Sequence, residues 1–184
     1  ESCNVNISHE VFAKLQEIDP YFENAQCKME LLSYRLDEFI DAGYAADGRI
    51  ELADIKDIDF LSKVWQKMAM EMEGFEFSIE DCRDRVESMI EEEILYVWKN
   101  GEGKIVATTS KGKIDKFGKV AAVYTLPEHR RRGYAINLVS EVTKLILAEG
   151  LVPTLYTDGG YTASNDCYKK IGYRQVGRLL TIKK

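Results

Sequence analysis

A strand-like run that ends in a basic loop is the segment of this sequence best suited to chemistry. Its residues are Val123, Tyr124 and Thr125, then Leu-Pro-Glu-His, then Arg130, Arg131, Arg132, Gly133, Tyr134 and Ala135. We expect a helix to begin at Gly133, and the N–H groups of a first helical turn have no helical partners and carry partial positive charge. Glycine lets a ligand approach the backbone, and arginines add forked donors. The pattern favours a phosphate site; the same residues could form only a solvated basic turn or a weak nuclear-targeting run.

Two regular elements are needed to hold this loop in place. Apolar spacing predicts a strand over 120–125 before it and a helix over about 133–149 after it. One stripe of the helix is apolar, and Gly150 is expected to end it. Further along, the sequence predicts a strand over 152–157, a helix over 163–171 and a strand over 173–182.

The region before the loop predicts two helices and a hairpin. A strand is expected over 49–53, a helix from Asp54 to an interruption at Gly74, and a second helix after a capping box over 78–81. Strands over 94–98 and 104–109 flank the turn 100–103, and a turn region follows over 111–118. From residue 49 the order is β-α-α-β-β-β-α-β-α-β, which predicts an α/β layered sheet with its longest antiparallel run in the middle.

Residues 1–47 are expected to be helical. Val11, Leu15 and Ile18 share one helical face, and apolar residues recur at helical spacing over 29–40. A segment of this length is too short to bury a core of its own. We therefore expect a helical N-terminal extension, residues 1–47, that packs on one domain, residues 48–184.

Charge is distributed unevenly along the chain. Its 184 residues carry a formal net charge of −6, but residues 1–93 hold 24 acidic and 9 basic side chains, whereas residues 94–184 hold 7 acidic and 16 basic ones. One half could face an anion and the other attract a cation, or two solvated surfaces could simply differ. Because the whole chain is acidic, no nucleic acid partner is expected.

The composition is typical of a soluble globular protein, with 45% hydrophobic and 30% charged residues. No apolar run approaches the ~20 residues of a membrane span and no signal peptide is visible, so no membrane contact is expected. The four cysteines lie far apart and there are only two histidines, so we expect no metal site and a reducing, cytoplasmic setting. Because the chain begins with Glu1 rather than Met, we expect a processed or truncated form.

Two blocks of the sequence fit patterns that recur together in one protein family. Residues 130–135 fit Q/R-x-x-G-x-G/A, and residues 155–158 and 164–173 form a second block that ends in Y-x-x-I/L-G-F/Y. Together they resemble the GNAT superfamily of acetyl-CoA-dependent N-acetyltransferases. The resemblance covers about residues 49–184 and implies a mixed, mostly antiparallel central sheet flanked by helices.

The resemblance implies acetyl-CoA as cosubstrate. In this family the loop and helix start hold the pyrophosphate through backbone amides, here residues 130–135. The preceding strand pairs with the pantetheine arm by β-addition, which implies Val123, Tyr124 and Thr125. An Asn in the helix after the fifth strand often reaches the cofactor, which implies Asn165. Asn165 could equally be a helix N-cap, a role that its residue type favours.

Tyr168 is the general acid that the resemblance implies. Attack of an amine on the thioester forms a tetrahedral oxyanion, which backbone amides can stabilise. Its collapse expels a thiolate whose conjugate acid has a pKa of ~8.5, and a phenol of pKa ~10 can supply the proton. In the alternative, the Tyr168 ring only packs beneath the cofactor.

The sequence assigns no general base, although an amine of pKa ~10.4 must lose a proton before it attacks. Glu71, Glu73 and Glu76 lie between two predicted helices, where the acceptor side of the family usually sits. They could attract a cation, act as a base through water, or form only a solvated face. Tyr124 could also line the site, and Cys167 is expected to be a core or wall residue rather than a covalent carrier.

The sequence therefore predicts direct transfer of acetyl from acetyl-CoA to a primary amine. The acceptor is a small molecule or a peptide of unidentified structure, and a homodimer is left open. Two other classes stay open: a coenzyme A-binding module that senses or regulates without turnover, and an interaction domain of a longer protein. The presence of Tyr168 favours the enzyme.

Overall fold

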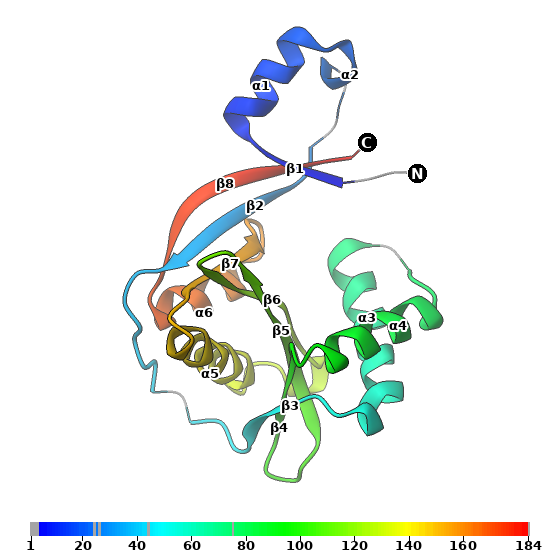
Figure 1. Ribbon diagram of the computed structural model, residues 1–184, viewed down its shortest axis with the longest axis vertical. Helices are drawn as coiled ribbons and strands as arrows, with labels where there is room; N and C mark the ends of the chain where they lie inside the picture. Colours follow the sequence, from blue (N-terminus) through cyan, green and yellow to red (C-terminus); the bar gives the residue numbers. More distant parts are fainter. Residues whose placement is uncertain (1–3, 24, 26, 44, 75, 184) are drawn as a thin grey trace. The chain divides into compact units, whose positions relative to one another are not determined.

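The computed structural model describes residues 4–183 except 24, 26, 44 and 75 (Figure 1). Contacts divide the chain into an internal unit, Ala42–Leu151, and a terminal unit, Glu1–Asp41 with Val152–Lys184. The described strand pairs are antiparallel and helices flank them. The mixed, mostly antiparallel α/β fold predicted from the sequence is confirmed. Within the described residues, no helix is both long and apolar enough to span a bilayer.

The internal unit is built on four antiparallel strands in chain order. They are β3 (Arg49–Leu52), β4 (Leu95–Lys99), β5 (Ile105–Ile114) and β6 (Phe117–Thr125). Its helices are α3 (Ile58–Glu73), α4 (Ile79–Glu91) and α5 (Tyr134–Ala148), with short 3-10 turns η1 (Ile55–Asp57) and η2 (Pro127–His129). In Figure 1, α3 and α4 lie on one side of these strands and α5 on the other. Both faces of this part of the sheet are thus covered.

Local sequence signals set the ends of α3 and α4. Ser78 Oγ accepts a hydrogen bond of 3.0 Å from the N–H of Asp81, which confirms the predicted cap of α4. Gly74 ends α3 in the left-handed conformation. The apolar faces of both helices pack on the strands, and the fully buried members of this core are Leu61, Val86, Leu95 and Val97.

The terminal unit combines strands from both ends of the chain. β8 (Tyr173–Lys183) pairs with β1 (Asn4–Ser8) on one side and with β2 (Cys27–Leu36) on the other, and β2 also pairs with β7 (Val152–Asp158). The helices are α1 (His9–Ile18), α2 (Pro20–Glu23) and α6 (Thr162–Ile171). α1 and α2 lie at the end of this ladder where β1 pairs with β8 (Figure 1).

The prediction of helix throughout residues 1–47 is wrong over 4–8, where β1 forms, and over 27–36. α1 and α2 form in the first part of this segment, but β2 replaces the helix expected over 29–40. At the end of β2, Tyr34 and Leu36 are buried and Arg35 is exposed, which is the period of a strand. The strands that flank β2 come from the other end of the chain, and a local apolar pattern carries no sign of them. The division into residues 1–47 and 48–184 stays a prediction.

The hairpin of β5 and β6 is longer than predicted. A turn region was expected over 111–118, but only Asp115 and Lys116 lie between the two strands. Asp115 has a φ of 53°, a left-handed conformation that Asp tolerates better than most residues. At Gly118 an added Cβ would lie 2.2 Å from Ile146 Cγ2, so α5 packs directly on the backbone of β6.

Gly172, the glycine of the second sequence block, should be the less replaceable of two helix-ending glycines. It ends α6 with a φ of 102°, and a Cβ there would lie 1.8 Å from the carbonyl oxygen of Glu38. Gly150 follows α5 with a φ of 71°, and no atom lies within 4 Å of the corresponding position. Gly150→Ala should cost only the left-handed backbone, ~1–2 kcal/mol. Gly172→Ala must also displace the Glu38 backbone, so its loss in unfolding free energy should be at least twice as large. Denaturant unfolding measures both, and equal losses would contradict this packing.

Candidate functional site

The turn from β6 into α5 leaves the first N–H groups of α5 without a side-chain cap. Gly133 is the N-cap residue with a φ of 83°, and Arg131 has a φ of 61°. The N-cap residue Gly133 makes no side-chain hydrogen bond to the first turn. The amide of Asn137 donates instead to the carbonyl oxygen of Gly133 at 2.8 Å. This geometry leaves N–H groups that an anion can use.

The three arginines of the loop differ in their surroundings. Arg131 and Arg132 are exposed. Arg130 is tied to its own unit: its Nε donates to the carbonyl oxygen of Thr125 at 3.0 Å, and its Nη2 donates to Glu71 Oε2 at 2.6 Å. Two of the three predicted guanidinium groups therefore face solvent, and the third is paired with a carboxylate.

Glu71, Tyr124 and Arg130 form one hydrogen-bonded group, which we call the Glu71 cluster. The hydroxyl of Tyr124 donates to Glu71 Oε1 at 2.9 Å, so both carboxylate oxygens of Glu71 accept hydrogen bonds. The Arg130 guanidinium also lies 5.4 Å from the centre of the Tyr124 ring. The cluster joins the last turn of α3 to β6 and to the basic loop.

Charges within the Glu71 cluster fix its protonation. The Arg130 guanidinium holds the pKa of Glu71 below its ordinary value, and the Tyr124 hydroxyl lowers it further. Burial and then the Glu71 carboxylate raise the pKa of Tyr124 to about 12. Near neutral pH Glu71 is ionised and Tyr124 is not, and a carboxylate of lowered pKa is a weak base. Of the other predicted glutamates, Glu76 is exposed, and the side chain of Glu73 lies outside the described residues.

β6 carries a bulge just before the residues expected to bind the pantetheine arm. The register shifts between Thr108 and Ser110 on β5, and Ala122 has a φ of 51°. Such a bulge increases the local twist and redirects the following backbone. Beyond it, the Tyr124 side chain is buried towards α3, whereas Val123 and Thr125 are half-buried.

Asp47 is a part of this region that sequence reasoning missed. Its carboxylate accepts hydrogen bonds from the Tyr134 hydroxyl at 2.6 Å and from the N–H of Gly101 at 2.7 Å, and its carbonyl oxygen accepts one from the Trp98 indole at 2.8 Å. Tyr134 is the first residue of α5, so Asp47 fastens this helix start to the β4–β5 turn. No local signal could have identified a contact between positions 87 residues apart.

Asn165 lies in the terminal unit and is only 5% exposed. It is not the N-cap of α6, which is Tyr161, so the capping alternative is wrong. Its side-chain amide donates to the carbonyl oxygens of Asp158 and Tyr161, each at 3.1 Å. The Oδ1 atom is buried and accepts no hydrogen bond from the described residues.

Tyr168 is also in the terminal unit and is 6% exposed. Its ring centre lies 6.4 Å from those of Tyr34 and Tyr173. Burial raises the pKa of Tyr168 well above its ordinary value. Burial likewise raises the pKa of Cys167 to about 11, so this thiol stays protonated and is a poor nucleophile.

Comparison with known proteins identifies the fold. Residues 102–180 match the family model of the FR47-like proteins. A GNAT-family acetyltransferase from Colwellia psychrerythraea superposes with a TM-score of 0.72 at 14% identity, over 99% of this chain and 64% of its own. A GCN5-related N-acetyltransferase from Sphaerobacter thermophilus gives 0.75 at 15% identity, over 100% and 59%. The chain has the GNAT fold. The resemblance found in the sequence is thereby confirmed.

Both sequence blocks of the GNAT resemblance, residues 130–135 and residues 155–158 with 164–173, lie inside the segment matched by the FR47-like family. A ribosomal-protein-alanine N-acetyltransferase from Brucella melitensis shares the fold with a TM-score of 0.58 at 17% identity, over 74% of this chain and 98% of its own. This chain spans 64% and 59% of the length of the Colwellia and Sphaerobacter chains. The sequence matches no curated protein.

The Glu71 cluster should make the stability of the protein depend on pH. Because the folded-state pKa of Glu71 is lowered from 4.5, its ionised form stabilises the fold above that value, and this contribution is lost as the pH falls through the folded-state pKa. At pH ~7 the melting temperature of the wild type should lie above that of Glu71→Gln. The corresponding difference in unfolding free energy should be about 1 kcal/mol or less, because the pair is partly exposed. The margin should shrink below pH 4.5.

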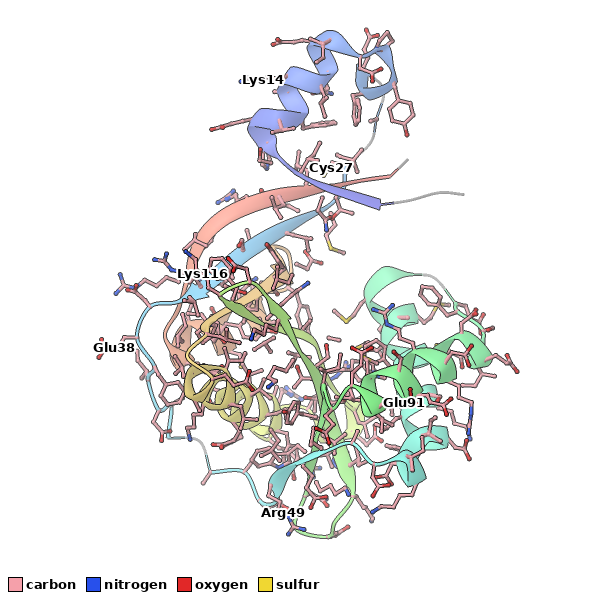
Figure 2. The ribbon with its side chains drawn as sticks, in the orientation of Figure 1. Lys14, Cys27, Glu38, Arg49, Glu91 and Lys116 are labelled. Carbon is pink, nitrogen blue, oxygen red and sulfur yellow. The ribbon has the colours of Figure 1, made fainter. Side chains whose placement is uncertain are left out.

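Thermal unfolding of both proteins across this pH range measures the effect. Glu91→Gln is the control, because Glu91, which Figure 2 labels on α4, is an exposed carboxylate in the same unit. A margin that grows towards acid pH, or that Glu91→Gln reproduces, would contradict the role given to the Glu71–Arg130 pair.

Proposed function

We propose that this GNAT-fold chain is an N-acetyltransferase that moves the acetyl group of acetyl-CoA directly to a primary amine. The observation that carries the proposal is the uncapped start of α5 beside the exposed Arg131 and Arg132. A pyrophosphate at this position would accept hydrogen bonds from the N–H groups and be neutralised by two guanidinium groups. Tyr134 and Ala135 supply the first N–H groups of the helix, and Asp47 holds Tyr134 in place.

β6 would hold the arm that carries the acetyl group. The amides of the pantetheine arm can pair with backbone groups of a strand, the β-addition mode. The bulge at Ala122 redirects the backbone of residues 123–125. N–H groups of this strand would then donate to the oxyanion of the tetrahedral intermediate.

The reaction balances without a covalent enzyme intermediate. The neutral amine attacks the thioester carbonyl carbon, the C–S bond breaks, and the amide nitrogen loses one proton while the departing sulfur gains one. We assign the donor of that proton to Tyr168, as the resemblance implies. A raised pKa makes a phenol a weaker acid, but the same burial raises the pKa of a thiol, as it does for the adjacent Cys167.

An amine acceptor agrees with two further observations. The acidic first half of the chain would attract a cationic or neutral acceptor rather than an anion. The Brucella protein, which is similar in fold, is named a ribosomal-protein-alanine N-acetyltransferase. We also propose a cytoplasmic setting, because Cys27, Cys82 and Cys167 are free thiols.

Release of free thiol from acetyl-CoA in the presence of a panel of amines tests the reaction. We expect release with primary amines, and we expect Gly133→Val to lower the affinity for acetyl-CoA by at least ~10-fold, because a branched side chain obstructs the phosphate at the helix start. Calorimetric titration measures the affinity. Gly103→Val is the matched control, since Gly103 also has a left-handed φ, 77°, and lies in open space.

Unchanged affinity in Gly133→Val would remove the site assignment. Turnover of acidic acceptors alone would contradict the electrostatic argument. Binding of acetyl-CoA without thiol release from any amine would favour the non-catalytic module instead.

Replacement of Tyr168 by Phe tests the general acid. The variant keeps the buried ring but lacks the hydroxyl that would donate the proton. We therefore expect kcat to fall by at least ~10²-fold while the affinity for acetyl-CoA changes little. Tyr34→Phe is the control, because it removes a hydroxyl from a buried ring next to Tyr168. Near wild-type kcat in Tyr168→Phe, together with lost stability in Tyr168→Ala, would assign the ring to packing.

A further inference from the structure

Each partner of the Glu71–Arg130 ion pair carries the charge that one ligand of the proposed reaction requires: Arg130 for the pyrophosphate and Glu71 for a cationic acceptor. Arg130 Nη2 and Glu71 Oε2 are 2.6 Å apart, and the two side chains are 39% and 35% exposed. Ion pairs this exposed contribute little net stability, so exchange of one partner is inexpensive. Arg130 also stands three residues before Gly133, where the pyrophosphate would bind.

A pyrophosphate at the start of α5 would attract Arg130 away from Glu71. Guanidinium groups pair with phosphate oxygens in a forked geometry, and a pyrophosphate carries more negative charge than one carboxylate. The Nε of Arg130 is held by the carbonyl oxygen of Thr125 at 3.0 Å. The base of the side chain can therefore stay anchored while its terminal nitrogens turn from carboxylate to phosphate.

Tyr124 would keep the uncovered carboxylate in place. Its hydroxyl donates to the other oxygen, Glu71 Oε1, at 2.9 Å, so departure of Arg130 removes only one of the two contacts. Tyr124 lies between Val123 and Thr125, the residues assigned above to the acyl-carrying arm. The result is an oriented carboxylate beside that strand that has lost its ion-pair partner, formed only when acetyl-CoA is bound; Lys67 on α3 remains a nearby positive charge.

We propose that Glu71 binds an ammonium group of the acceptor and that Arg130 blocks this position until acetyl-CoA binds. This inference rests on the proposed function. An ammonium group beside a carboxylate is stabilised in its charged form and has no lone pair with which to attack. The group at Glu71 therefore serves recognition, and a second amino group reacts. The acceptor class is a molecule with at least two amino groups, such as a diamine or polyamine.

A fixed clamp, in which Glu71 only positions Arg130 for the cofactor, makes the opposite prediction. In a clamp, loss of the Glu71 charge loosens Arg130 and weakens cofactor binding. In the exchange, the same loss removes the carboxylate that competes with the pyrophosphate for Arg130, so cofactor binding becomes stronger. The sign of the change separates the two arrangements.

The first experiment titrates coenzyme A into the wild type, Glu71→Gln and Glu91→Gln. Gln at position 71 can still accept the hydrogen bond of Tyr124, so only the charge is removed. We expect the Kd for coenzyme A to fall about threefold in Glu71→Gln, the range that an exposed ion pair allows, and to stay unchanged in Glu91→Gln. A higher or unchanged Kd in Glu71→Gln overturns the exchange.

The second experiment compares 1,4-diaminobutane with 1-aminobutane as acceptors. Glu71→Gln should raise KM for the diamine by ~10-fold or more and leave KM for the monoamine unchanged. Arg130→Gln uncovers Glu71 permanently, so this variant should bind the diamine without coenzyme A, whereas the wild type should bind it only with coenzyme A present. Melting temperatures establish that each variant is folded.

The outcomes distinguish failure of the gated ammonium site from failure of the proposed acetyltransferase function. Equal changes for the two amines, or diamine binding by the wild type without coenzyme A, overturn the gated ammonium site and leave the acetyltransferase proposal standing. A wild type that binds no coenzyme A overturns the proposed function itself, and the gated site with it.

Discussion

A helix that begins on a left-handed glycine has no N-cap side chain to accept hydrogen bonds from its first N–H groups, and α5 begins in this way. Gly133 provides the turn, and Arg131 also adopts a left-handed φ just before it. The cost of those unpaired groups is met by solvent or by an anion. Hydrogen bonds from neighbouring elements hold this turn in place, so the loop is both basic and fixed to its unit.

Two acidic residues fasten the turn from different directions. Asp47 accepts from Tyr134 and Gly101, which joins the start of α5 to the β4–β5 turn. Glu71 accepts from Arg130 and Tyr124, which joins the loop to the last turn of α3. Both carboxylates come from the acidic half of the chain, and their partners from the basic half. Only Glu71 and Arg130 form an ion pair between the two halves, since the partners of Asp47 are a neutral hydroxyl and a backbone N–H.

The Glu71 cluster also joins the two sides of the proposed reaction. α3 lies on the side where GNAT proteins usually receive the acceptor, and β6 and the basic loop are the elements proposed for the cofactor. In the proposed arrangement, one carboxylate that contacts both would make cofactor binding and acceptor binding depend on each other. The chemistry of amide formation does not require this link. It comes from the residues at positions 71, 124 and 130.

Local signals in the sequence were sufficient for the elements around the loop. The apolar stripe of α5, Gly133 at its start, the Ser78 cap of α4 and Gly74 at the end of α3 all act within a few residues, so their outcome could be predicted directly. The GNAT fold was expected because two short blocks resemble the patterns of that superfamily. The tertiary structure decided what depends on distant partners: β2 is a strand because β7 and β8 flank it, and Asn165 is buried within α6 instead of capping it. It also decided that Arg130 pairs with Glu71 and that Asp47 holds Tyr134. These contacts join residues 59 and 87 positions apart, and their energy exists only once the chain has folded to bring them together.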